Sequence, residues 1–186
     1  MADTLIIRPT SDVSKTYWTG TGDSSNLYAN VDESSKNESD YNQIVTSTHP
    51  ILYGFANHTT ESGTINKITL KSYLKKSGDD NDLFKRCIKI GSTIYYSSQF
   101  YLTTSYVLHT WEMTVKPSNS EAWAWDDVDA FIGGSIISGQ VGKYCNLLDC
   151  MTWAEVEYEE ASGWSNIAKY NGVAVADIAK INGVAV

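Results

Sequence analysis

The residue types that most often carry out chemistry in proteins are sparse in this chain of 186 residues. Its three histidines, His49, His58 and His109, lie far apart, and none belongs to a metal-binding or catalytic-triad signature. His109 alternates with apolar neighbours, so we expect an interior imidazole rather than a ligand. The run Gly134–Gly139 lacks the glycine spacing of a nucleophile elbow. The sequence therefore predicts no catalytic site and no enzyme.

Metal ligands and reactive thiols are equally sparse. Asp79, Asp80 and Asp82 lie in an acidic loop whose oxygen atoms could hold calcium, but the spacing of an EF-hand is missing and polar hairpin tips are common. Cys145 and Cys150 are five residues apart in an extended segment, which separates them by about 16 Å and prevents a disulfide unless the chain turns between them. We expect no metal and no cofactor.

Alternating polar and apolar residues predict that most of the chain forms β-strands. Twelve Tyr, six Trp and only three Pro favour the same structure. The clearest strands, 63–76 and 83–91, flank a polar loop and are predicted to form a hairpin. Strands are also expected over 4–9, 13–19, 44–45, 51–55, 92–100, 105–115 and 147–159, with one short helix over 125–132 that ends at Gly133-Gly134. Strands at this spacing predict an all-β fold, an antiparallel jelly-roll-like β-sandwich.

The C-terminal segment repeats one motif. An 11-residue period relates 167–175 to 178–186 and preserves eight of nine positions. Each copy contains Asn-Gly, the strongest short signal for a two-residue turn, so each is predicted to form a small hairpin, with Tyr170 opposite Val173 and Lys169 opposite Ala174 in the first. An isolated two-stranded ribbon is marginal in water, so a neighbouring molecule is expected to cover its apolar side. The alternatives are a helical coil, which the mid-repeat glycines disfavour, and a disordered tail.

Two domains follow from this pattern. Residues 1–160 are predicted to form the sandwich, and residues 161–186 an assembly or anchoring segment. The predicted assembly interface comprises Trp164, Ile167, Tyr170, Asn171, Gly172, Val173, Val175, Ile178, Ile181, Asn182, Gly183 and Val184. Three equivalent hairpins around one axis would bury their apolar side chains together, so we expect a homotrimer of sister chains.

Charge and hydropathy exclude two classes of partner. The formal net charge is −8, and such a surface repels the phosphate backbone of nucleic acid. No apolar run approaches the 18 or so residues that a membrane-spanning helix needs. The N-terminal residues lack a secretory signal peptide, so synthesis in a cytoplasm is expected.

Several segments resemble β-sandwich proteins found among phage and prophage virion components. These segments are Ile7–Thr10 and the stretches 63–75, 95–106, 122–134 and 155–158, and the repeats over 164–186 are similar to a segment common in phage tail-fibre and head-fibre proteins. The resemblance implies a non-enzymatic structural protein located in the virion: a head fibre, a capsid decoration protein or a tail-fibre or other tail-associated protein that contacts capsid or tail proteins. The chain departs from the common pattern by having Cys145 and Cys150 near its last strand.

A carbohydrate-binding or host-receptor-binding module of a phage fibre is the alternative function. Sandwich domains that bind sugars use exposed aromatic rings, and Trp123, Trp153 and Tyr101 are the candidate contacts for a cell-surface glycan. Against this, Trp123 adjoins the predicted short helix, where an aromatic ring more often plugs the end of a sandwich and buries about 150–250 Å².

Overall fold

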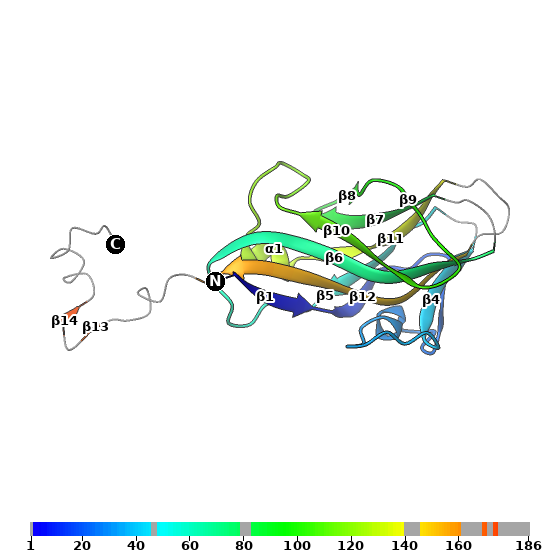
Figure 1. Ribbon diagram of the computed structural model, residues 1–186, viewed down its shortest axis with the longest axis horizontal. Helices are drawn as coiled ribbons and strands as arrows, with labels where there is room; N and C mark the ends of the chain where they lie inside the picture. Colours follow the sequence, from blue (N-terminus) through cyan, green and yellow to red (C-terminus); the bar gives the residue numbers. More distant parts are fainter. Residues whose placement is uncertain are drawn as a thin grey trace.

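The computed structural model of the protein describes residues 2–45, 48–78, 83–139, 146–160, 169–170 and 173–174. Within these ranges, two antiparallel sheets pack face to face, and one short α-helix lies at an end of the sandwich (Figure 1). The predicted all-β sandwich with a single short helix is confirmed. Sheet A runs β10 (Val107–Met113), β6 (Thr64–Ser77), β12 (Asn146–Glu159), β4 (Tyr41–Val45) and β3 (Trp18–Thr21), with β1 (Ala2–Ile7) also beside β12. Sheet B runs β2 (Pro9–Ser14), β5 (Ile51–Phe55), β11 (Ile132–Gly139), β7 (Leu83–Ile90) and β8 (Thr93–Tyr96), with β9 (Phe100–Tyr101) also beside β7.

Most connections cross from one sheet to the other. The chain changes sheet between β1 and β2, between β4 and β5, and again between β6 and β7. The predicted hairpin of 63–76 with 83–91 is therefore wrong: β6 belongs to sheet A and β7 to sheet B. The polar loop between them marks a turn correctly, but a turn signal does not say which strands pair. Each strand has an apolar face, and these two faces meet across the core instead.

The core lies between the sheets and follows the predicted alternation. Strand β6 buries Ile68, Leu70 and Leu74, and β7 buries Phe84 and Ile88. Burying an aliphatic or aromatic side chain of this size contributes about 1.5–3 kcal/mol. All members of the two described core clusters lie between Ile7 and Tyr158, within the sandwich.

The predicted strand over 13–19 is two strands. β2 ends at Ser14 and β3 begins at Trp18, and these strands belong to different sheets. A turn separates them, in which the Trp18 N–H donates to the Lys15 carbonyl at 3.0 Å and Tyr17 has a φ of 66°. Left-handed backbone is rare for a bulky residue, and the sequence contains no glycine or asparagine there that would indicate it.

The helix is shorter than predicted. α1 spans Trp125–Asp129, and the Asp127 carboxylate accepts a hydrogen bond from the Ala124 N–H at 2.9 Å at its start. The prediction that Gly133-Gly134 ends the helix is wrong, because both glycines lie inside β11. A Cβ on Gly134 would lie 1.9 Å from the Ile51 carbonyl oxygen of the neighbouring strand. Glycine is required there for close strand approach, not for helix termination.

The first C-terminal repeat contains the predicted hairpin. β13 (Lys169–Tyr170) pairs with β14 (Val173–Ala174) in antiparallel fashion, with Lys169 opposite Ala174 and Tyr170 opposite Val173, as predicted. These strands form a two-stranded sheet of their own. The second repeat lies outside the described residues, as do Trp164, Ile167, Asn171, Gly172, Val175, Cys145, Asp79, Asp80 and Asp82.

The first and last strands of the sandwich meet at one end. β1 is antiparallel to the second half of β12, with Ala2 opposite Glu159, and Figure 1 shows the N-terminus beside the arrowhead of β12.

A 3₁₀ turn, η1 (Leu27–Asn30), lies between β3 and β4. In the part of the chain that is described, no helix has the length and hydropathy to cross a membrane.

Candidate functional site

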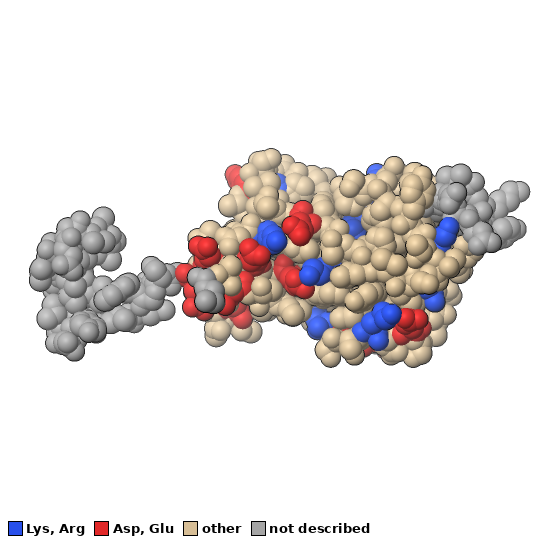
Figure 2. Space-filling view, in the orientation of Figure 1, with Lys and Arg blue, Asp and Glu red and all other residues tan. Residues whose placement is uncertain are grey.

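Carboxylates gather where β1 begins and β12 ends. We call this region the acidic edge: residues 2–7 of β1 together with residues 154–160. It contains no Lys, Arg or His, and its acidic residues are Asp3, Glu155, Glu157, Glu159 and Glu160. Figure 2 shows Asp and Glu concentrated at this end of the sandwich. All charged side chains of the acidic edge are therefore negative.

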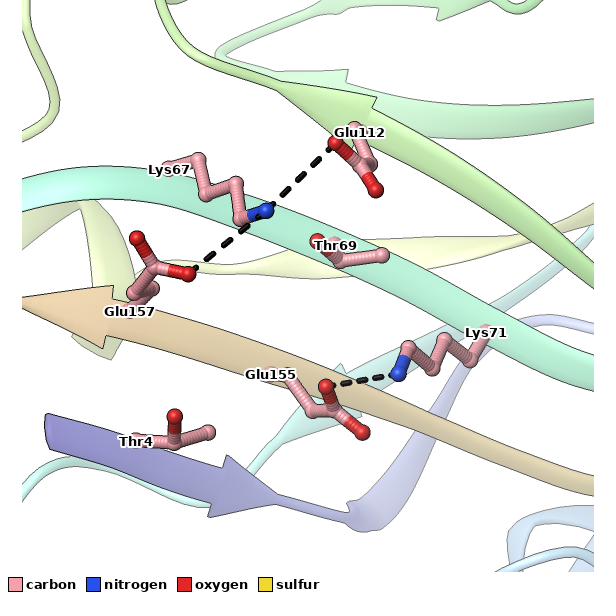
Figure 3. Close-up of a pocket in the computed structure, with 7 residues that line it drawn as sticks. All are labelled: Thr4, Lys67, Thr69, Lys71, Glu112, Glu155 and Glu157. Carbon is pink, nitrogen blue, oxygen red and sulfur yellow. Dashed lines mark hydrogen bonds and ion pairs between the residues drawn. The ribbon is translucent and has the colours of Figure 1, made fainter. Parts of the chain in front are cut away.

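A shallow hollow adjoins the acidic edge on the outer face of sheet A. Its volume is about 100 Å³, and side chains from four neighbouring strands line it (Figure 3). Thr4 of β1 lies opposite Glu157 of β12, and Glu155 lies opposite Thr69 of β6, so strand pairing alone brings these side chains to one face. The lining residues are Thr4, Lys67, Thr69, Lys71, Glu112, Glu155 and Glu157.

The charged groups of the hollow are paired with one another. Lys71 Nζ lies 2.6 Å from Glu155 Oε2, and Lys67 Nζ lies 3.5 Å from a carboxylate oxygen of both Glu112 and Glu157 (Figure 3). The second oxygen of Glu155 accepts a hydrogen bond from the Trp153 indole N–H at 3.0 Å, outside the hollow's lining. The hollow is thus a surface of satisfied ion pairs.

These pairs keep both kinds of group charged. Glu112, followed by Glu157, raises the pKa of Lys67. Burial raises the pKa of Glu155, but the hydrogen bonds from Lys71 and Trp153 outweigh it and the pKa is lowered overall. General acid–base catalysis needs a pKa near the working pH, and small-molecule sites usually enclose about 300–1,000 Å³. At about 100 Å³ the hollow is smaller than this range.

The three candidate glycan contacts lie in separate places. Trp123 is only 6% exposed and belongs to the core, and its indole N–H donates to the Met113 carbonyl at 2.9 Å. It therefore packs inside the sandwich, which is the role predicted for it as the alternative to a sugar contact. Trp153 is 9% exposed on the outer face of sheet A, with its ring centre 6.0 Å from that of Tyr73. Tyr101 alone displays its ring, at 64% exposure. The structure does not bring these rings together into one platform.

The end opposite the acidic edge displays two tyrosines. Tyr17, 68% exposed, and Tyr101 are the most exposed large hydrophobic residues in the described ranges. Tyr17 precedes the start of β3, and Tyr101 pairs with Leu83 at the start of β7, which follows the far end of β6. The Tyr17 ring meets the His49 ring edge-on, with 4.8 Å between centres. Sequence reasoning missed Tyr17, because nothing in the sequence signals its positive φ.

A buried polar network joins the two sheets. Arg86 of β7 is fully buried, and its Nη1 donates to Ser72 Oγ at 2.5 Å and to Ser135 Oγ at 3.0 Å. The Ser72 hydroxyl is hydrogen-bonded to that of Thr152, which donates to Asp149 Oδ2 at 2.9 Å. Burial raises the pKa of Asp149 to about 7 and lowers that of Arg86 to about 10, so the guanidinium stays charged at neutral pH.

His109 borders this network, as the predicted interior imidazole. Its ring stacks on Phe100 with 4.4 Å between centres, and its backbone carbonyl accepts a hydrogen bond from Arg86 Nη2 at 3.3 Å. Burial, and then the Arg86 charge, lower the pKa of the imidazole to about 4. The imidazole is therefore neutral at pH 7 and packs against the Phe100 ring.

Other chemistry is not assembled in the described residues. Cys87 and Cys150 are both buried and unpaired, and burial raises the pKa of each thiol to about 12, so neither is a reactive thiolate. Within the described ranges, no three His, Cys, Asp or Glu side chains are grouped so as to hold a metal ion.

Comparisons with known proteins do not place the chain in a family. No family model matches it, and no curated protein matches it. A solved structure titled "CBM4 structure and function" matches with a TM-score of 0.30 and 9% sequence identity, over 80% of this chain and 94% of that chain. A likeness at this score carries no argument about function.

Proposed function

We propose that the protein is a non-enzymatic structural component of a phage particle, which assembles with sister chains or docks on other virion proteins through its C-terminal repeats. The observation that carries this proposal is the hairpin β13–β14, whose two-residue strands pair only with each other within the described residues. A two-stranded ribbon this short is marginal in water and needs a further surface to pack on. The phage assignment is supported by the sequence resemblance.

The organisation of the chain supports an assembly role. The described core residues all lie within 7–158, in the sandwich itself. Both ends of the sandwich lie beside each other at the acidic edge, so an assembly element attached there leaves the rest of the body free. In the neighbouring hollow the pKa of Lys67 is raised and that of Glu155 is lowered, which favours the charged form of each.

Light scattering of the full chain and of residues 1–160 tests the proposal. We expect a homotrimer, with three times the chain mass of 20.6 kDa, for the full chain and a folded monomer for residues 1–160. Circular dichroism serves as the control for an intact sandwich in the shorter protein. The same number of subunits in both proteins would remove the repeats from the proposal.

A second candidate function, binding of a cell-surface glycan, is favoured by the two exposed tyrosines at the end far from the acidic edge. An aromatic ring held outward by a strained backbone is a feature that recurs at ligand sites. Tyr17→Ala and Tyr101→Ala should then abolish retention on host polysaccharide, whereas Tyr96→Ala, which changes an exposed ring on the edge strand β8 of sheet B, should not. A glycan array with no ligand for the parent protein would count against this function.

A further inference from the structure

β1 is a strand with one open side. In the described part of the chain it pairs with β12 alone, and Ala2, Asp3, Thr4 and Ile6 are exposed. Along an antiparallel edge strand, backbone N–H and C=O groups point alternately toward the partner strand and outward, so β1 presents unpaired groups to solvent. Ile6, 50% exposed, adds an apolar side chain beside them. Lys and Pro, which commonly block such edges, are missing from this strand.

The charge of the acidic edge is opposite to that of the repeats. Of the five carboxylates of the edge, Glu155 and Glu157 are paired with lysines of β6, which leaves Asp3, Glu159 and Glu160 as its net charge. The segment 161–186 carries Lys169 and Lys180 against Asp177. The other two edge strands of sheet A, β10 and β3, contain one carboxylate between them, Glu112 of β10. Complementary charge steers association and selects between alternative surfaces, which favours β1 over β10 as the place where a repeat binds.

The hairpin also has open sides. β13 and β14 pair with each other, and neither pairs with β1 in the single chain. Adding the hairpin to β1 would make it part of a larger sheet, which removes the instability of a lone ribbon. Each copy has its acceptor strand at the end of the sandwich from which its own repeats follow. Exchange of hairpins around a closed ring of copies therefore gives each β1 edge one hairpin from a neighbouring copy.

We propose that the β1 edge receives the C-terminal hairpin of a second copy of this chain, by strand addition to sheet A. This inference rests on the proposed assembly function and names the surface on which the repeats bind. The backbone of β1 supplies the hydrogen bonds, exposed Ile6 supplies apolar surface, and the negative charge of the acidic edge attracts the net positive charge of the segment 161–186.

A charge exchange in the full chain tests the contact. The edge variant is Asp3→Lys with Glu159→Lys, the repeat variant is Lys169→Glu with Lys180→Glu, and the exchanged variant carries all four changes. Each of the first two should weaken self-association about tenfold at low salt, and the exchanged variant should return to within about threefold of the parent. Light scattering over a concentration series measures the association.

The matched control is Glu38→Lys with Glu121→Lys, two exposed carboxylates outside the acidic edge that change the net charge equally. It should leave the association within about twofold of the parent. Amide hydrogen exchange of the parent provides a second measurement that needs no variant. Exchange over residues 2–7 should slow as the chain assembles, while exchange over residues 107–113 of β10 should not change.

The outcomes separate the two proposals. An assembled parent in which the edge variant behaves like the control and residues 2–7 exchange at one rate throughout would overturn strand addition at β1 and leave the assembly function standing. A parent that stays monomeric at all concentrations would overturn both. Slow exchange of residues 2–7 in a monomer would show that the chain's own repeat occupies the edge, which also overturns the proposal of a second copy.

Discussion

Replacing Asp149 with asparagine should change how the stability of the protein depends on pH. The carboxyl is fully buried in β12, and burial raises its pKa from 3.8 to about 7. Between these values the native state binds the proton and the unfolded state does not, so the free energy of unfolding falls as pH rises through this window. A difference of about three pKa units corresponds to about 4 kcal/mol.

The asparagine variant removes this dependence and keeps the hydrogen bond from Thr152, because its amide oxygen still accepts. The free energy of unfolding of the parent minus that of Asp149→Asn should therefore decline by about 4 kcal/mol between about pH 4 and pH 8. His109 acts in the opposite direction: its lowered pKa means that the unfolded state takes up a proton first, so stability is lost as pH falls below 6.5. This contribution is common to both proteins and cancels in the difference.

Urea unfolding followed by tryptophan fluorescence at several pH values measures the difference. Glu155→Gln is the matched control on the same strand. Because the pKa of Glu155 is lowered, its contribution to stability is present at neutral pH and lost in acid, the opposite sign from Asp149. A parent-minus-variant difference for Asp149→Asn that stays flat with pH would refute the account of the buried network.

Three further predictions concern the core and the hollow. Gly134→Ala should destabilise the sandwich by more than about 3 kcal/mol in thermal unfolding, because the added Cβ would lie 1.9 Å from the Ile51 carbonyl oxygen; an unchanged melting temperature would contradict this. Arg86→Met should cost about 3–5 kcal/mol above pH 7, where it leaves the Asp149 charge buried without compensation, and less near pH 5; urea unfolding at both pH values checks it. Lys71→Met should cost at most about 1 kcal/mol, since its ion pair is partly open to solvent, and a loss above about 2 kcal/mol would argue against a simple surface pair.

The fold class was predictable because burial imposes a period of two on each strand. β6 and β7 show apolar residues at alternate positions, and so does β12 from Ala154 to Tyr158, whereas residues 147–154 of β12 are buried without a break. Arg86 occupies one of these inward positions, so its burial was visible in the pattern. Its partners were not, because Ser72 and Ser135 lie on strands that only the three-dimensional fold brings to it.

Neither the pairing of the strands nor the roles of Gly133-Gly134 and Tyr17 could be predicted from the neighbouring residues in the sequence. Nothing in the sequence of 77–83 says whether the chain returns to the same sheet or crosses to the other. Gly133-Gly134 resembles a helix stop, yet its role depends on how closely the backbone of Ile51 approaches. Tyr17 has no sequence signal for its left-handed conformation.

The candidate site was predicted only in part. The hairpin register of Tyr170 and Val173 followed from Asn-Gly alone, because that dipeptide specifies a two-residue turn. The acidic edge depends on β1 pairing with the end of β12, and the paired residues are 147 to 157 positions apart in the sequence. Long-range pairing of this kind leaves no trace in local composition.

Amide hydrogen exchange of the first repeat as a function of protein concentration tests the central claim most directly. The account predicts that the amides of Tyr170 and Val173 exchange rapidly in dilute protein and become protected over the same concentration range in which light scattering reports assembly. Protection that is already complete in the monomer, or rapid exchange that persists in the assembled state, would contradict it.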